Sequence, residues 1–238
     1  MNTKTNYKRK PEAGYKIFTD RKLSLQKLVE ELVETSTLHY QSEWKMDENF
    51  NWVLLSWNIK FSELPKIYDN ITISTEIIGH VSFFIIRKYS AFNSEGSLLL
   101  EAYAVWSLID VNTRSIIRLP KDLTLDVKKL KRSELEIYLP IIDMPDIYCT
   151  QTFVAPTHED IDSNNHVNNA VYFNWLERII PSFSSDTLIN STIKVLYKKE
   201  ILPNEKVRLR FYENSKSFVL KITSKDGDEI KALLELVK

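Results

Sequence analysis

The chain has 238 residues, of which 43% are hydrophobic and 27% are charged, and its formal net charge is zero. This length suits one large domain or two small ones, and a zero net charge argues against nucleic acid as the main partner. No segment approaches the roughly 18 apolar residues that a membrane span needs, and the polar, basic N-terminus lacks the apolar core of a secretory signal.

Glycine and cysteine are both scarce. The chain has four glycines, and they stand far apart. Phosphate-binding loops, dinucleotide-binding motifs and the G-x-S-x-G nucleophile elbow need clustered glycines, so the sequence argues against all three. The single cysteine, Cys149, excludes an intramolecular disulfide. We therefore expect a protein of the reducing cytoplasm.

The first half of the chain predicts one helix followed by strands. Apolar residues recur at helical spacing from Ser24 to about Leu38, and Ser24 is a suitable N-cap. Strands are predicted over residues 52–61, around residues 71–75, and over residues 81–91 and 98–111. The last two flank residues 93–96, which form a hairpin turn signal.

The second half repeats this order. A helix is predicted from about Val167 to Ile180, where Pro181 stops it. Strands are predicted over residues 192–200, 207–212, 218–223 and 229–237, with a turn at 225–227 before the last of them. Aligning Pro65 with Pro203 brings the two glycine-containing turns to matching places. The sequence therefore predicts one structural unit that occurs twice.

One helix followed by an antiparallel meander is the plan of a hotdog domain, in which a curled sheet wraps a central helix. Two such units can share a continuous sheet and each hide an edge. The predicted fold class is therefore α+β, a tandem (double) hotdog. The connection is placed at about 121–146. The division taken is 1–130 for the first unit, 131–146 for the linker and 147–238 for the second unit. The basic run 128–132 is expected to be a solvated surface segment.

The densest polar cluster covers residues 158–169, directly before the second helix. Capping and turn formation explain one or two of these residues, but not the two-residue spacing of Asp162, Asn164 and His166. In an extended segment that spacing points all three side chains the same way.

Each of these three side chains suits one task. Asp162 can accept a proton or hold a water, and His166 can act as base or acid. Asn164 and the N–H groups at the helix start can donate to an oxyanion. The cluster is interpreted as acyl-transfer machinery that needs no serine or cysteine nucleophile.

The cluster resembles a family motif. The segment reads DIDSNNHVNN at residues 160–169, followed by Tyr172 and Trp175. It is similar to the D-x-D-x-N-x-H-V-N-N-x-x-Y-x-x-W motif of the acyl-acyl carrier protein thioesterases of plants and bacteria. In the first half, WVL at 52–54, IK at 59–60 with Pro65, VW at 105–106 and NTR at 112–114 also resemble the family. The likeness covers roughly residues 15–238 and lacks the plastid transit extension of the plant enzymes, so we expect a bacterial enzyme.

The resemblance implies hydrolysis of the thioester of fatty acyl-acyl carrier protein, which releases free fatty acid and ends chain elongation. It implies catalytic roles for Asp162, Asn164 and His166, and for Glu200 in a segment similar to the family's Y-[RK]-[RK]-E-C. Ile201 replaces the cysteine of that segment, which excludes a papain-like cysteine mechanism. Cys149 is expected to be a small buried or edge residue. No cofactor and no metal are implied.

Two chemistries stay open. In one, a carboxylate and His166 activate a water that attacks the thioester directly. In the other, Asp162 or Glu200 attacks first and forms an anhydride. Attack by water is favoured, with Glu200 fixing a ring nitrogen of His166 or positioning the water.

The acyl chain is expected within the first unit, between its helix and the strands that carry Trp52, Trp57, Phe61 and Trp106. Burial in the core is the simpler explanation of each of these residues taken alone. The expected partner is acyl carrier protein, which is typically acidic. Its candidate contacts are Lys194, Lys198, Lys199, Arg178 and the run Lys128 to Arg132. The sequence leaves a homodimer open.

Three alternatives remain. His158, Asp160, Asp162 and His166 are metal-binding residue types, although the thioesterase motif already accounts for three of these positions. An acyl-CoA thioesterase is the second alternative, and the two-unit length argues against it, since many hotdog enzymes acting on CoA esters are single units that dimerise. A non-catalytic acyl-binding hotdog module is the third, and the intact set of four polar residues argues against it.

Overall fold

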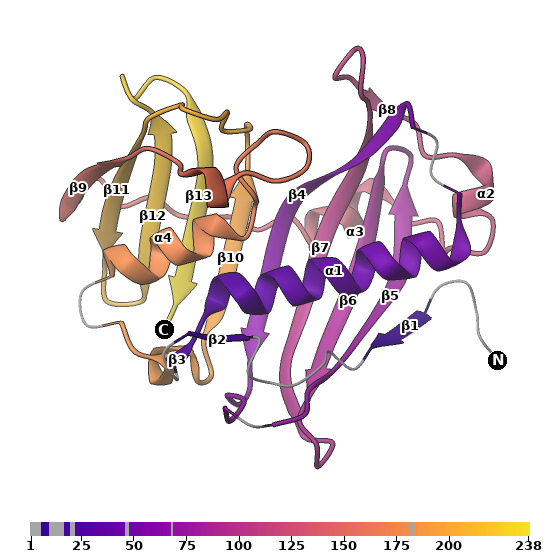
Figure 1. Ribbon diagram of the computed structural model, residues 1–238, viewed down its shortest axis with the longest axis horizontal. Helices are drawn as coiled ribbons and strands as arrows, with labels where there is room; N and C mark the ends of the chain where they lie inside the picture. The colour runs from indigo at the N-terminus through magenta and orange to yellow at the C-terminus, as the bar shows by residue number, and fades with distance from the viewer. Residues whose placement is uncertain (1–5, 10–16, 20–21, 46–47, 68, 181–182) are drawn as a thin grey trace.

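The computed structural model of the chain describes residues 6–238, apart from 10–16, 20–21, 46–47, 68 and 181–182. Its elements form two units, each with one helix against a sheet (Figure 1). The first unit holds β1 (Asn6–Arg9), α1 (Leu25–Glu43), β4 (Phe50–Phe61), β5 (Thr72–Val81), β6 (Phe84–Phe92) and β7 (Leu98–Asp110). The second holds β9 (Thr150–Val154), α4 (Val171–Ile179), β10 (Thr192–Tyr197), β11 (Val207–Glu213), β12 (Ser217–Ser224) and β13 (Ile230–Val237). Shorter elements are β2 (Phe18–Thr19), β3 (Lys22–Leu23), β8 (Ile116–Ile117), α2 (Lys121–Thr124), α3 (Arg132–Glu136), η2 (His158–Asp160) and η3 (Ser185–Leu188).

The strand order shows the repeat directly. The sheet runs β1-β5-β6-β7-β4-β10-β13-β12-β11-β9, so each unit has the same order when counted from the junction. At the junction β4 and β10 pair antiparallel, with Lys60 opposite Thr192 and Ser56 opposite Leu196. This pairing removes one exposed edge from each unit and makes the sheet continuous. The predicted tandem arrangement is confirmed.

Two hairpin turns lie at matching places in the units. Gly96 joins β6 to β7 with φ of 87°, and Gly227 joins β12 to β13 with φ of 95°. Glycine adopts these left-handed values at little cost, whereas most side chains do not. Asn93 supports the first turn, because its Oδ1 accepts from the N–H groups of Glu95 and Ser97 at 3.0 and 2.9 Å. Both turns were predicted from the sequence.

Helix α1 starts where the sequence predicts and ends five residues later than predicted. Ser24 Oγ accepts from Lys27 N at 3.4 Å and caps the first turn. Four predicted apolar positions, from Leu25 to Leu32, are buried, whereas Val33 is half-buried. The last turns bury Thr35, Ser36 and His39, which are polar. The prediction stopped short because the apolar repeat fades there while the helix continues.

Two predicted boundaries in the second unit are wrong, and both bear on the site. Helix α4 begins at Val171 rather than Val167, because Asn168 forms a capping turn that accepts from Ala170 N through Oδ1 and from Val171 N through its carbonyl, each at 2.9 Å. Pro181, the predicted stop, lies outside the described residues. Strand β10 ends at Tyr197 rather than at 200, so Glu200 stands on a loop.

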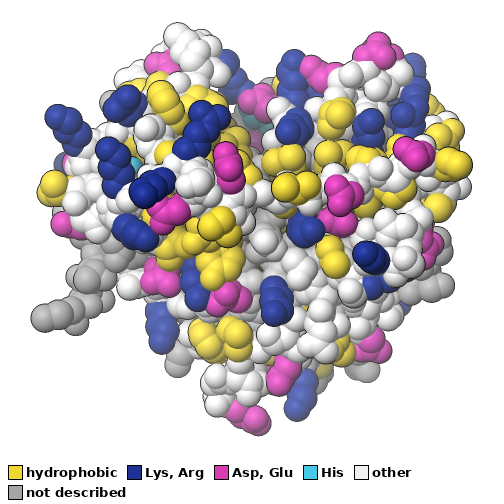
Figure 2. All heavy atoms as spheres, turned by 180° about the vertical axis from the view of Figure 1, so that it is seen from behind, with side chains coloured by type: hydrophobic (Ala, Val, Ile, Leu, Met, Phe, Trp, Pro, Cys, Tyr) yellow, Lys and Arg dark blue, Asp and Glu magenta, His cyan; other side chains and the backbone are white. Residues whose placement is uncertain are grey.

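The connection between the units packs on the sheet face opposite α1. Leu130 and Leu135 are buried there against Ile86 and Val105. The predicted linker 131–146 therefore begins with a short helix, α3, that covers apolar surface of the first unit. The four basic residues of the run 128–132 are exposed, as predicted. Figure 2 shows that basic, acidic and hydrophobic side chains are interspersed over the face seen from behind the helices.

None of the described helices is both long and apolar enough to cross a membrane.

Candidate active site

The segment that carries Asp162, Asn164 and His166 is a tight turn, so the expectation of an extended segment was wrong. Asp162 N donates to His166 O at 2.8 Å, and Asn165 N donates to Asp162 O at 3.0 Å. Asn165 has φ of 61°, a left-handed value that asparagine tolerates better than most residues. Turn chemistry therefore outweighs the two-residue spacing as a guide to the backbone.

The carboxylate of Asp162 holds this turn together. Its Oδ1 accepts from Asn164 N at 2.8 Å and from His166 N at 3.3 Å. Asp162 thus orients the backbone of both other members of the motif. Its second oxygen, Oδ2, is the atom that remains for a water or substrate.

One cavity is lined by all four residues that the sequence predicts for the site. Asp162, Asn164, His166 and Glu200 line a cavity of about 510 Å³ between the two units. Tyr172 and Tyr197 line it from the second unit, and Trp52 from the first unit. Burial raises the pKa of Tyr172, and the nearby Glu205, Glu200 and Asp162 raise it further, so this phenol stays neutral. The fold brings the four side chains to one cavity, although Glu200 lies on a different loop from the other three.

Asn164 is held from the first unit. Asn51, on β4, donates from Nδ2 to Asn164 Oδ1 at 2.7 Å. Asn51 is itself oriented by Trp52 N, which donates to its Oδ1 at 2.9 Å. The Nδ2 group of Asn164 is then the donor left to face the cavity. Sequence reasoning missed Asn51, although it directly precedes the WVL segment.

His166 and Glu200 form a pair that an arginine of the first unit joins. His166 Nε2 lies 2.8 Å from Glu200 Oε2, and the imidazole is mostly buried while the carboxylate is 41% exposed. Arg114 Nη2 makes an ion pair with Glu200 Oε1 and lies 3.1 Å from His166 Nε2. The sequence marks Arg114 only through the resemblance of NTR at 112–114 to the family, which predicts no role for it.

A buried lysine fixes the loop that carries Glu200. Lys231 on β13 has only 5% of its side chain exposed, and its Nζ contacts Glu205 at 2.6 Å and Glu229 at 2.7 Å. The same Nζ donates to the carbonyl of Glu200 at 3.2 Å. Burial alone would lower the pKa of Lys231, but the two carboxylates outweigh it and raise the pKa. Lys231 therefore stays charged and ties the loop to the sheet.

The start of α4 supplies fewer oxyanion donors than expected. The N–H groups of Ala170 and Val171 donate to Asn168, and that of Phe173 donates to the carbonyl of Ala170. Three N–H groups of the first turn are therefore occupied, and the side chain of Asn164 becomes the main candidate donor.

A second cavity, of about 460 Å³, adjoins the turn 162–166. It lies between α1, through Val33, Ser36 and Tyr40, and the strands that carry Trp52 and Trp106. Its other end is lined by the turn residues Asp162, Ser163, Asn164, Asn168 and Asn169. Two of the four aromatic residues predicted for an acyl slot thus line it. The other two, Trp57 and Phe61, are fully buried in the main core.

The residues of the metal alternative do not converge. Asp160 Oδ2 accepts from Thr157 N at 2.7 Å and from Thr157 Oγ1 at 2.9 Å. No group of three potential ligands with metal-site geometry occurs in the part of the chain that the structure describes. Cys149 is exposed beside edge strand β9, with its N–H donating to Phe211 O at 2.8 Å, and Ile201 is fully buried.

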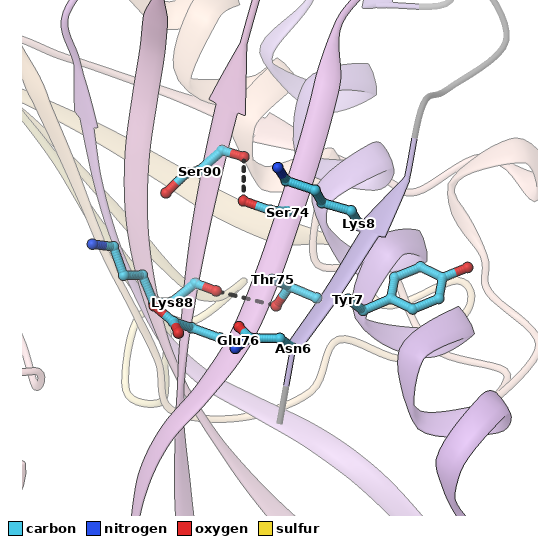
Figure 3. Close-up of a pocket in the computed structure, with 8 residues that line it drawn as sticks. All are labelled: Asn6, Tyr7, Lys8, Ser74, Thr75, Glu76, Lys88 and Ser90. Atoms are coloured by element: carbon cyan, nitrogen blue, oxygen red, sulfur yellow. Dashed lines mark hydrogen bonds between the residues drawn. The ribbon is translucent and has the colours of Figure 1, made fainter. Parts of the chain in front are cut away.

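A further hollow, of about 280 Å³, lies at the other end of the sheet, where β1 pairs with β5. Figure 3 shows it lined by strand residues such as Tyr7, Lys8 and Lys88. Thr75 Oγ1 donates to Lys88 O at 3.1 Å there, and none of the four predicted site residues takes part.

Solved structures of similar fold cover nearly the whole chain. A putative oleoyl thioesterase of Lactobacillus plantarum is 20% identical with a TM-score of 0.75, covering 98% of this chain and 95% of the other. The 12:0-acyl carrier protein thioesterase of Umbellularia californica is 16% identical with a TM-score of 0.77, covering 98% and 96%. These likenesses show the fold, and they confirm the predicted double hotdog.

The curated relatives are longer proteins, and this chain matches only part of each of them. A chloroplastic acyl-[acyl-carrier-protein] hydrolase of Cuphea viscosissima is 24% identical over 206 residues, which are 79% of this chain and 50% of that protein. A chloroplastic palmitoyl-acyl carrier protein thioesterase of Gossypium hirsutum is 22% identical over 205 residues, with the same coverage. The chain therefore spans about half the length of the curated relatives it matches.

Two family descriptions match the sequence in succession. The acyl-ACP thioesterase N-terminal domain matches residues 4–126, and the acyl-ACP thioesterase C-terminal domain matches residues 149–235. Together they cover most of the chain. The chain belongs to the acyl-ACP thioesterase family.

Proposed function

We propose that the protein hydrolyses the thioester of a fatty acyl-acyl carrier protein and releases the free fatty acid. The observation that carries this proposal is one cavity lined by Asp162, Asn164, His166 and Glu200, next to a second cavity along α1. The first offers groups that suit a thioester carbonyl. The second has a mixed lining, in which apolar side chains such as Val33, Trp52 and Trp106 could contact an acyl chain beside polar ones. The names of the relatives support the same reaction.

In this proposal the pair of His166 and Glu200 activates a water. Glu200 holds Nε2 of the imidazole, which leaves Nδ1 as the nitrogen that accepts the proton of the water. The water oxygen attacks the thioester carbonyl carbon, and Asn164 Nδ2 donates to the oxyanion that forms. When the carbon–sulfur bond breaks, the thiolate takes the proton from His166. Atoms and charges then balance to a carboxylic acid and a thiol.

The role proposed for Asp162 differs in part from the one that the sequence predicts. Its Oδ1 accepts from two backbone N–H groups, so only Oδ2 can meet a water or the substrate. Direct attack by water is favoured over an anhydride on Asp162, because the pair of His166 and Glu200 offers a base for that water. Asp162 holds the turn, and its second oxygen orients the water.

The division of labour follows the two units. Residues 1–130 bind the acyl chain, residues 131–146 connect, and residues 147–238 carry the four catalytic residues. The first unit also reaches into the site, because Asn51 contacts Asn164 and Arg114 contacts Glu200.

The acyl carrier protein is proposed to dock near the mouth of the catalytic cavity. Lys198 and Lys199 line that cavity, and both are exposed. Lys199 is paired with Glu229, and Lys194 with Glu235, which leaves Lys198 as the better candidate of the three for an acidic partner. A cytoplasmic location and a bacterial origin belong to the same proposal, and a homodimer stays open.

Matched substrates test the function. The chain should hydrolyse acyl-acyl carrier protein with a higher kcat/KM than acyl-CoA of the same chain length, and His166→Ala should lower kcat by about 10² to 10⁴-fold. A preference for the CoA ester would make the protein an acyl-CoA thioesterase. Binding without hydrolysis at every chain length would make it an acyl-binding module. Expression in a fatty-acid-secreting bacterium, with identification of the free acids, gives the chain preference.

A further inference from the structure

Arg114 stands on a turn that presents its side chain to the second unit. The turn joins β7 to β8, and Asp110 Oδ1 accepts from Asn112 N at 3.0 Å and from Thr113 N at 2.8 Å. Arg114 N donates to Asp110 O at 2.8 Å. These hydrogen bonds lower the pKa of Asp110, so its carboxylate stays charged and the turn stays formed across the neutral range.

The backbone of Arg114 is in an unfavourable conformation. Its φ is 57°, in the left-handed region where glycine or asparagine costs less than arginine. Residues held in such conformations often occur at functional sites, where the side chain has a role. The side chain of Arg114 reaches Glu200 and His166, 86 and 52 residues further along the chain.

The contacts of Arg114 and Glu200 indicate which ring nitrogen of His166 carries the proton of the neutral imidazole. His166 Nε2 lies 2.8 Å from Glu200 Oε2 and 3.1 Å from Arg114 Nη2. It cannot donate to the carboxylate and accept from the guanidinium at once. Donation to the carboxylate is charge-assisted and shorter, which favours a proton on Nε2. The guanidinium of Arg114 then donates its hydrogen bond to Glu200 rather than to His166.

We propose that Arg114 is a positioning residue of the second unit's active site, supplied by the first unit. By binding Oε1 it fixes the Glu200 carboxylate so that Oε2 meets Nε2 of the imidazole. His166 then presents Nδ1 to accept a proton from water. This inference rests on the proposed function.

The exposure of the ion pair separates this role from a structural one. The side chains of Arg114 and Glu200 are 45% and 41% exposed, and ion pairs this exposed add little to stability. Removing Arg114 should therefore slow catalysis while leaving the fold intact.

The first experiment compares Arg114→Gln, Arg114→Lys and the control Arg118→Gln. Arg118 is an exposed arginine four residues further on, placed over the ring of Phe83 and outside the site. Arg114→Gln should lower kcat by about 10 to 100-fold, with KM within about threefold of wild type and an unchanged Tm. Arg114→Lys keeps the charge and should recover part of kcat. Arg118→Gln should behave as wild type.

The second experiment asks whether Arg114 acts through Glu200. In a Glu200→Gln background, Arg114→Gln should have little further effect on kcat, because the carboxylate that it orients is gone. An Arg114→Gln kcat close to wild type, or an equal loss with and without the Glu200 carboxylate, would overturn the inference.

A third measurement does not depend on turnover. Long-range ¹H–¹⁵N spectra report which nitrogen of each imidazole is protonated, and the chain has only four histidines, so His166→Ala identifies the relevant signals. In wild type the neutral imidazole of His166 should be mainly the Nε2–H tautomer, and Arg114→Gln should raise the share of the Nδ1–H tautomer. A wild-type protein without thioesterase activity would count against the proposed function. An unchanged imidazole signal in Arg114→Gln would count against the role of Arg114.

Discussion

Asn51 and Asn164 are joined by a 2.7 Å hydrogen bond between side-chain amides that stand 113 residues apart in the chain. Asn51 belongs to β4, the strand of the first unit that pairs with β10 of the second. The bond therefore depends on how the two units join. It also sets which end of the Asn164 amide faces the cavity, because Asn51 donates to Oδ1 and leaves Nδ2, the donor to the oxyanion in the proposed reaction.

Changes at Asn51 should reduce turnover through the orientation of Asn164. Asn51→Ala removes the constraint and should lower kcat by about tenfold. Asn51→Asp should cost more, because a carboxylate repels Oδ1 of Asn164 and favours the flipped amide, which turns an acceptor toward the oxyanion. Steady-state kinetics on acyl-acyl carrier protein measure both. Asn58→Ala, on the same strand but away from the turn, is the control. Equal rates for Asn51→Asp and wild type would refute this role.

Two substitutions of Asp162 should separate its charge from its hold on the turn. Asparagine also accepts backbone N–H groups in such turns, so Asp162→Asn should keep the fold and Tm while lowering kcat by about 10² or more. Asp162→Ala leaves the N–H groups of Asn164 and His166 without this acceptor, which should cost about 1–2 kcal/mol of stability as well as activity. Thermal unfolding and kinetics of both variants are the measurements. Equal stability of the two variants would show that the carboxylate does not hold the turn.

Local patterns in the sequence predict most of the fold. The apolar spacing in α1, the aromatic and β-branched run of β4 and the two glycine turns are each encoded within a few neighbouring residues. Their repetition predicts the tandem arrangement, and the strand order bears it out. The two-residue spacing in segment 162–166 predicts the wrong backbone, because the turn-forming Asp, Ser and Asn side chains decide the local conformation instead.

The contacts between the units could not be predicted in this way. Arg114 and Asn51 reach the second unit only because β4 pairs with both β7 and β10, which brings two distant segments to one place. The burial of Lys231 also depends on contacts between distant segments. This lysine alternates with apolar residues on β13 as a solvent-facing residue would, and it is buried because the loop that carries Glu200 folds over it. Such burial depends on tertiary packing and leaves no periodic signal.

A larger side chain at Val33 should shorten the preferred acyl chain. Val33 is half-buried on α1 and lines the second cavity opposite Trp52 and Trp106. Val33→Phe adds a ring to a cavity of about 460 Å³, so long acyl chains should lose more kcat/KM than short ones. The distribution of released fatty acids shows the shift. Ser42→Phe, an exposed position of the same helix outside this lining, should leave the distribution unchanged. An unaltered distribution in Val33→Phe would place the acyl chain elsewhere.

Glu177 should make stability fall as the pH rises toward neutral. This carboxylate of α4 accepts from Leu25 N, at the start of α1, at 3.1 Å. Burial raises its pKa from the ordinary value of 4.5 to about 7, although that hydrogen bond opposes the rise. Between these two values the folded protein holds more protons than the unfolded chain, so the free energy of unfolding decreases with increasing pH.

The size of this effect is about 1–3 kcal/mol, and it should be complete near pH 8. Glu177→Gln keeps an oxygen that accepts from Leu25 N and removes the titration. Urea unfolding between pH 5 and pH 8 should therefore show a steeper loss of stability in wild type than in Glu177→Gln. All other ionisable groups are common to the two proteins, so their contributions cancel in the difference. Parallel pH profiles would mean that the contact between α1 and α4 does not depend on the charge of Glu177.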